Sequence, residues 1–393
     1  MRERNFYNYK NAVGAKGVAI GEDSHKSYSH KGYSYKTATG LIENIIAKKE
    51  KELSLFSDEE AGGPVAVTSA SRSYIDRAGK RVNLTPVQMK LVTAFAQVVD
   101  TILGEEKNKK YIEALPGEID NSPRDKEGYI RRPQGSIGCP VDILKLAKLV
   151  YSADRIGGKQ TGKVKEEVKK LSEIRQEFVY RDESGKIFAK RRAALISIPD
   201  EIDLYHDGEQ KNIWYIRFED VFVYDINSRY SLSPITLLQL WNATGVQTEL
   251  FTMLLFLLQS VRGSFITHAN NIVADREKEL RKAKKDKEEI KKVLAALKES
   301  SLTYREGVTS ILERLDTNKY KDKGKYINYT KLNKDLKQAA DALLSMGIIS
   351  KYYESTGSTG GRICNFVIND DWIVDESNKI KASLPPGGDL KGE

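Results

Sequence analysis

Residues 332–368 read LNKDLKQAADALLSMGIISKYYESTGSTGGRICNFVI, and this stretch decides the fold. Apolar residues recur at helical spacing up to Gly347, which predicts a helix over Thr330–Met346 that ends at this glycine. Two strand-like runs follow, Ile348–Tyr353 and Arg362–Ile368, on either side of a glycine-rich turn. The stretch therefore predicts a helix followed by a β-hairpin.

The spacing within this helix separates two faces. Leu332, Leu336 and Leu343 fall on one side, so the helical repeat directs a polar set to the other side. The polar set is Lys331 at the rim, then Lys334, Lys337, Gln338 and Asp341. Exposed lysine and glutamine side chains can read base edges in the major groove of DNA. An ordinary solvated face is the alternative, and the adjacent hairpin favours DNA contact.

Two helices are expected well upstream of this stretch. Thr85 can cap a helix that begins at Pro86, and apolar residues continue its pattern to Ile102. A second helix is expected from Cys139-Pro140 to Val150. Its expected buried side is Val141, Leu144, Leu146, Ala147 and Val150.

A third helix and a hairpin complete this upstream module. The helix is expected to begin near Thr161, with one apolar face made by Val164, Val168, Leu171 and Ile174. Strand-like runs follow at Glu177–Tyr180 and Ile187–Ile198, joined by a polar turn. Helix, turn, helix and hairpin in this order is typical of a winged helix.

The same order recurs in the second half of the chain. Thr248–Val261 is strongly apolar and predicts a core helix, and a further helix is expected over Tyr304–Leu315. Residues 274–299 lie between them and carry ten basic and seven acidic residues, which favours a solvated helix or arm.

These patterns predict an α+β protein with two winged-helix domains in tandem, over residues 81–235 and 236–375. The second domain contains the charged helical insertion 274–299. Residues 1–80 form a basic N-terminal extension, expected to be largely disordered apart from a short helix near Leu41–Leu55. Residues 376–393 are expected to be a disordered tail.

Charge points to a polyanionic partner. The net charge is +9, and basic residues exceed acidic ones by six over 155–192 and by five over 317–366. The candidate DNA contacts in the first module are Lys159, Thr161, Lys163, Lys165, Lys169, Lys190, Arg191 and Arg192. In the second module they are Lys331, Lys334, Lys337, Gln338 and Arg362.

Catalytic and metal motifs are not found in the sequence. The four histidines are not at metal-ligand spacing, and the two cysteines, Cys139 and Cys364, indicate reduced core residues. Residues 157–163 nearly match a phosphate-binding loop, but Val164 replaces the required hydroxyl residue and a helix precedes the motif. We expect a binding protein, not an enzyme, with neither cofactor nor metal.

The sequence also favours a cytoplasmic location. The N-terminus has no apolar signal-peptide core, and the most apolar run, Leu250–Leu258, is too short to span a bilayer. No membrane partner is expected.

Three stretches resemble a known family, the plasmid replication initiators with tandem winged-helix domains that bind repeated origin sequences (iterons). They are NLTPVQMKLVTAFAQVV (83–99), VDILKLAKLV (141–150) with KVKEEVKKLSEI (163–174), and LNKDLKQAADALLSMGIISKYYE (332–354). The resemblance implies that Lys331, Lys334, Lys337 and Gln338 lie on the recognition helix for double-stranded origin repeats. It also implies a second reading helix at Lys159–Lys165, a possible homodimer, and recruitment of a host helicase or helicase loader.

This chain departs from the family pattern in its long N-terminal extension, in residues 103–138 and in the charged run 274–299. Three other functions stay open. A winged-helix transcription regulator of a phage or mobile element shares every local feature. A rolling-circle nicking enzyme is disfavoured by the histidine pattern, and a non-DNA scaffold would use its winged helices for protein contacts.

Overall fold

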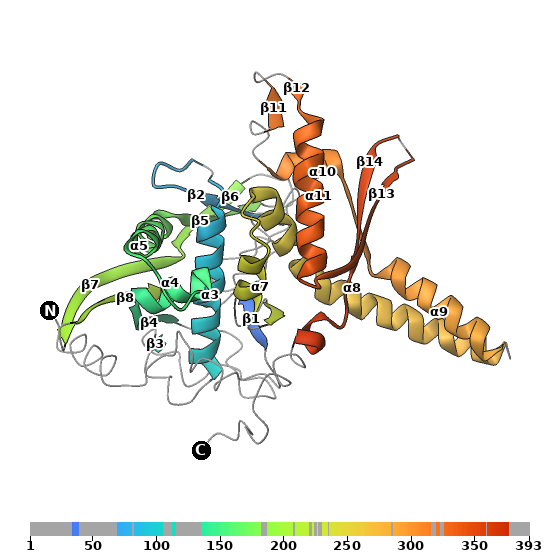
Figure 1. Ribbon diagram of the computed structural model, residues 1–393, viewed down its shortest axis with the longest axis horizontal. Helices are drawn as coiled ribbons and strands as arrows, with labels where there is room; N and C mark the ends of the chain where they lie inside the picture. Colours follow the sequence, from blue (N-terminus) through green and yellow to red (C-terminus); the bar gives the residue numbers. More distant parts are fainter. Residues whose placement is uncertain are drawn as a thin grey trace, which may run out of the picture. The chain divides into compact units, whose positions relative to one another are not determined.

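The computed structural model divides into two compact units, shown in Figure 1. Unit 1 lies within residues 1–239 and 383–393, and unit 2 is Leu240–Ala382. The residues that the structure describes are 34–38, 69–80, 82–104, 112–114, 135–181, 187–206, 209–219, 222, 223, 226, 230–234, 236–283, 286–315, 320–322, 326–358 and 360–376. Both units combine helices with antiparallel strands.

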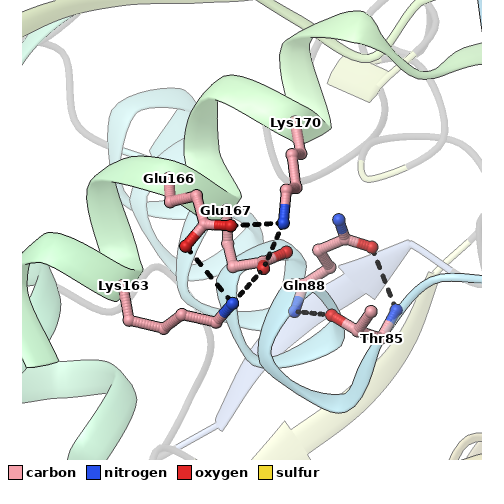
Figure 2. A network of polar contacts seen from close by, with 6 residues as sticks. All are labelled: Thr85, Gln88, Lys163, Glu166, Glu167 and Lys170. Carbon is pink, nitrogen blue, oxygen red and sulfur yellow. Dashed lines mark hydrogen bonds and ion pairs between the residues drawn. The ribbon is translucent and has the colours of Figure 1, made fainter.

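Three helices lie among the described residues between 82 and 181 of unit 1: α3 (Pro86–Gly104), α4 (Ile143–Tyr151) and α5 (Gly158–Glu173). Thr85 caps α3, as the sequence predicts, and Gln88 completes a reciprocal capping box. The Thr85 N–H donates to Gln88 Oε1 at 2.9 Å, and the Gln88 N–H donates to Thr85 Oγ1 at 3.2 Å (Figure 2). Every residue from 88 to 102 is buried, so α3 is the core helix of this unit.

Three sheets accompany these helices. A three-stranded sheet has the order β2 (Ser69–Ile75), β5 (Arg175–Arg181), β6 (Ile187–Ala194). A four-stranded sheet has the order β3 (Ile112–Ala114), β4 (Gly135–Asp142), β8 (Glu209–Phe218), β7 (Ile196–His206). The strands β1 (Ser34–Ala38) and β9 (Tyr230–Pro234) form a separate pair. All neighbouring strands are antiparallel.

Aromatic rings link α3 to the four-stranded sheet. The Phe95 and Phe218 ring centroids are 5.2 Å apart in an edge-to-face arrangement, and Phe218 stacks on Phe222 at 5.7 Å. Short α7 (Leu237–Ala243) then leads the chain into unit 2.

Unit 2 is built around the long helix α8 (Glu249–Lys282), which Thr248 caps. Its first part is fully buried, and its second part packs against α9 (Lys287–Ser301) to form a two-helix arm (Figure 1). The chain continues through β10 (Thr303–Gly307) and α10 (Val308–Arg314) to the small hairpin of β11 (Lys321–Asp322) and β12 (Tyr326–Ile327). The helix α11 (Tyr329–Ser345) and strands β13 (Ile349–Thr356) and β14 (Arg362–Ile368) follow, and the sheet order is β10-β14-β13.

Among the described residues, one helix, α8, is long and apolar enough to cross a membrane by length and composition alone. The 18-residue window that passes this test is 56% buried inside the fold, as expected for a core helix. Trp241 packs edge-on against Phe251 and Phe256 of this helix, with centroids 6.0 and 5.7 Å apart.

The structure corrects three sequence expectations. Cys139-Pro140 does not begin a helix, because residues 137–142 pair with β8; Asp142 caps α4 instead, and Leu144 is 42% exposed. Tyr304–Gly307 is strand β10, not helix, because it pairs with β14. The run Ile187–Ile198 is two strands, β6 and β7, in different sheets.

Two strands, β1 and β2, lie within the N-terminal extension and pair with strands of unit 1. Of residues 1–80, the structure describes only 34–38 and 69–80. The expected short helix at Leu41–Leu55 and the tail after residue 376 lie outside the described residues. The expected helix at Thr330–Met346 and its two following strands are confirmed to within a few residues.

Candidate nucleic-acid interface

The two faces of α11 are those that the sequence predicts. Leu332, Leu336 and Leu343 are at most 1% exposed, whereas Lys334, Lys337 and Gln338 are exposed. The polar face borders an open groove of about 440 Å³. The groove is lined by Thr244, Val246, Lys334, Lys337, Gln338, Asp341, Ala342 and Ser345.

The lysines of this face keep their charge available. Within the described part of the chain, Lys334 and Lys337 form no ion pair or hydrogen bond. The ammonium of Lys331 lies 5.9 Å from the centre of the Tyr320 ring. The polar face of α11 therefore presents a net positive charge to solvent.

A side-chain cap and a left-handed glycine fix the ends of α11. Asn328 Oδ1 accepts the Lys331 N–H at 2.9 Å, which satisfies a backbone donor of the first turn. Gly347 has a φ of 73°, a conformation that costs glycine little and other residues more.

Arg362 is held by protein contacts. Its Nε donates to Glu354 Oε2 at 2.7 Å and its Nη2 to Glu354 Oε1 at 2.9 Å, across the β13–β14 hairpin. Its Nη1 donates to Asn333 Oδ1 on α11 at 2.7 Å. The hydrogen bonds from Arg362 hold the pKa of Glu354 below its ordinary value. Arg362 therefore joins the hairpin to the helix.

The helix α5 is arranged differently, as Figure 2 shows. The ammonium of Lys163 lies 2.8 Å from Glu167 Oε1 and 3.4 Å from Glu166 Oε2, and Lys170 contacts the same two glutamates. The Glu167 side chain is only 3% exposed. The hydrogen bond to Glu167 raises the pKa of Lys163, and the one from Lys170 lowers the pKa of Glu166.

Other predicted contacts of unit 1 are also bound to protein groups. Lys165 donates to Asn212 Oδ1, and Lys169 lies 2.9 Å from Glu201 and 5.1 Å from the centre of the Trp214 ring. Arg192 donates to Glu177 Oε1 at 2.7 Å.

The remaining predicted contacts fall at the start of α5 or on β6. Lys159 is exposed, and Thr161 is half-buried with its hydroxyl 3.4 Å from the Gly157 carbonyl. The side chains of Lys190 and Arg191 lie outside the described residues.

The near match to a phosphate-binding loop is helical. Residues 158–163 form the first turns of α5, and Gln160 closes a cap by accepting the Gly157 N–H at 3.1 Å. This geometry differs from that of a phosphate-binding loop, whose extended backbone wraps around the phosphates.

Among the described residues, no group of three or more histidine, cysteine, aspartate or glutamate side chains could hold a metal ion. Cys139 and Cys364 are both free and buried, and burial raises the pKa of the Cys139 thiol to about 12. Both cysteines lie in the core, as the sequence predicts.

Sequence reasoning missed the protein partners of the lysines and arginines that it predicted to contact DNA. Glu166 and Glu167 lie three and four residues after Lys163, a spacing that is visible in the sequence. It also missed the exposed tyrosines Tyr326 and Tyr329, which are 77% and 55% exposed beside the start of α11.

No protein-family model matches this chain, and no curated protein matches its sequence. Two solved structures of RctB match with low scores. Domains 2 and 3 of RctB, crystallised as selenomethionine derivatives, give a TM-score of 0.36 at 10% identity, over 78% of this chain and 93% of that chain. A second structure of RctB domains 2–3 gives 0.37 at 11% identity, over 80% and 96%. Such TM-scores do not establish a shared fold.

Proposed function

We propose that this chain binds double-stranded DNA sequence-specifically through winged-helix units, with α11 as its principal reading helix. The order β10, α10, α11, β13, β14, with a three-stranded antiparallel sheet, supports a winged helix in unit 2. In unit 1, the order α3, α4, α5, β5, β6 supports a second one.

The observation that carries the proposal is the exposed face of α11. It combines a glutamine with two lysines that have no partner among the described residues, and its opposite face is anchored by buried leucines. Lysine can reach the acceptors of guanine, and glutamine can pair with adenine through two hydrogen bonds. A rigid helix that offers these groups suits the major groove.

The resemblance to plasmid initiators supports a more specific role. We propose that the protein initiates replication of a plasmid or related mobile element by binding origin repeats. Recruitment of a host helicase or helicase loader, a possible homodimer and a cytoplasmic location belong to this proposal. A transcription regulator with the same DNA interface is the second candidate, because the α11 face suits either role.

DNA binding is tested with a matched pair of double variants. Lys334→Ala/Lys337→Ala removes two charges from the α11 face. Lys291→Ala/Lys292→Ala removes two exposed lysines of α9 that have no partner in the part of the chain that the structure describes. On a duplex selected from a random pool, the α11 variant should bind more weakly. Its loss of affinity should be larger on the selected duplex than on a scrambled duplex, because the two lysines are assigned to base contacts. Equal behaviour of the two variants would contradict the assignment to α11.

Initiation is tested in cells and with the purified protein. A plasmid that carries this gene and its flanking repeats should replicate, whereas a regulator would change transcription without supporting replication. The purified protein should not nick supercoiled origin DNA. Metal-dependent cleavage with a covalent 5′ attachment would identify a rolling-circle enzyme instead.

A further inference from the structure

A second small hairpin lies at the start of α11. The strands β11 and β12 stand between α10 and α11 in sequence, and Figure 1 draws them at the N-terminal end of α11. In most helix-turn-helix units, a short turn of three or four residues joins the corresponding helices. Here the connection runs from residue 315 to residue 328.

This hairpin is anchored to α11 through Tyr320. The Tyr320 ring is 1% exposed, and its hydroxyl donates to Asp335 Oδ2 at 3.0 Å. Its carbonyl accepts the N–H of Asn328, the cap residue of α11, at 2.6 Å. Lys331 lies over the same ring. The start of the hairpin therefore has a fixed position beside the first turns of α11.

The anchors place two hairpins on different sides of α11. Asp335 and Lys331, which contact Tyr320, lie about 100° and 60° around the helix from Lys334 in one direction. Asn333, which contacts Arg362 of the β13–β14 hairpin, lies about 100° in the other direction. The polar face of α11 thus lies between the two hairpins.

Tyr326 is the exposed aromatic side chain of this second hairpin. It is 77% exposed and forms no hydrogen bond or ring contact with the described residues. A tyrosine hydroxyl can donate to a phosphate oxygen, and such contacts position a protein on DNA without reading its sequence.

We infer that the β11–β12 hairpin is a second flanking element that contacts the sugar–phosphate backbone beside the groove occupied by α11, with the Tyr326 hydroxyl donating to a phosphate. This inference rests on the proposed DNA binding by α11. The positive charge of the α11 face complements the backbone on which Tyr326 would lie. The contact extends the bound length of duplex and contributes affinity rather than base discrimination.

Tyr329 provides a matched control for Tyr326. It is also a tyrosine and is 55% exposed, but it lies five residues before Lys334, about 140° around the helix from that lysine. Both variants remove exposed side chains, so both should keep the wild-type thermal stability.

The experiment compares Tyr326→Ala and Tyr329→Ala on a duplex selected by the wild-type chain and on a scrambled duplex. Tyr326→Ala should weaken binding to both duplexes alike, by about ten-fold, the lower range for a hydrogen bond to a charged group. In ethylation interference, the footprint of Tyr326→Ala should lack phosphates that the wild-type footprint contains, at one end only. Tyr329→Ala should match the wild type.

An unchanged affinity and footprint for Tyr326→Ala, or a loss confined to the selected duplex, would overturn the inference. Either of these outcomes would overturn only the role of Tyr326, and the proposed DNA binding by α11 would stand as long as the wild-type chain binds the duplex. A wild-type chain that binds no duplex would instead overturn the proposed function.

Discussion

The helices α5 and α11 look alike in sequence and differ in what their charges contact. Each follows another helix, precedes a β-hairpin and buries one apolar stripe. The segment around α5 has the larger excess of basic residues. In the structure, four of the five lysines of the helix α5 contact carboxylate or amide oxygens. Lys334 and Lys337 of α11 have no partner in the described residues.

The difference shows that a count of charges does not measure the charge available to a ligand. A lysine in an ion pair must leave its carboxylate before it can neutralise a phosphate, and the carboxylate then repels that phosphate. The cations of α5 therefore contribute less to a DNA interface than their number indicates. The comparison favours α11 over α5 as the reading helix of the proposed function.

The buried stripes of the two helices should be equally sensitive to truncation. Leu171→Ala in α5 and Leu336→Ala in α11 each remove a side chain that is at most 1% exposed. Each should destabilise its unit by about 2–5 kcal/mol, through lost burial and the cavity that remains. Urea denaturation followed by circular dichroism measures the change. A loss below about 1 kcal/mol for either variant would contradict its place in the core.

The exposed face of α11 should carry base discrimination. Lys334→Ala or Gln338→Ala should cost about 1–3 kcal/mol on the selected duplex if each makes a good base contact, and far less on a scrambled duplex. Binding titrations of both duplexes at one fixed salt concentration provide the measurement. Equal losses on both would make α11 a backbone clamp and would move base reading to α5.

Local spacing explains why α11 was predictable. Its apolar repeat, its cap region and Gly347 all lie within one short stretch, so the sequence predicts the helix, its buried face and the following hairpin. The errors came from long-range pairing. Proline suits a helix start, yet Pro140 lies in β4 because that strand pairs with Tyr215 and its neighbours, far along the chain.

The cations predicted to contact DNA have protein partners of two kinds, distant in sequence or local in sequence. The bonds of Arg362 to Glu354 and Asn333 cross a hairpin and reach a separate helix, so they need the tertiary structure. Lys163 and Glu167 are four residues apart on one helix, a spacing that predicts an ion pair. A net charge summed over the whole segment does not show this pairing.

The ion pair between Glu354 and Arg362 in the β13–β14 hairpin should stabilise the fold in a pH-dependent way. Arg362 lowers the pKa of Glu354, so the pair stabilises the fold above the ordinary pKa of glutamate and loses this effect as pH falls through the lowered value. Both side chains are more than a third exposed, so the contribution at pH 7 should be at most about 1 kcal/mol.

Urea denaturation of the wild type and of Glu354→Gln, from pH 7 downward, measures how much this ion pair contributes to the free energy of unfolding. The wild type should be the more stable at neutral pH, and the difference should shrink below about pH 4, as the Glu354 carboxylate is protonated. A difference that grows toward acid would show that the carboxylate destabilises the hairpin.

The smallest effect is expected for Lys163→Ala in α5. Because Lys163 is already paired with Glu166 and Glu167, its removal should change the affinity for any duplex by less than about two-fold. Lys159→Ala is the matched control, since Lys159 is exposed on the same helix and pairs with none of the described residues, and it should weaken binding at least as much. Titration of both variants on the selected and scrambled duplexes distinguishes the two lysines. A uniform loss for Lys163→Ala that exceeds the loss for Lys159→Ala would mean that phosphate displaces Glu167 from the ion pair, and that α5 is a DNA-contacting helix like α11.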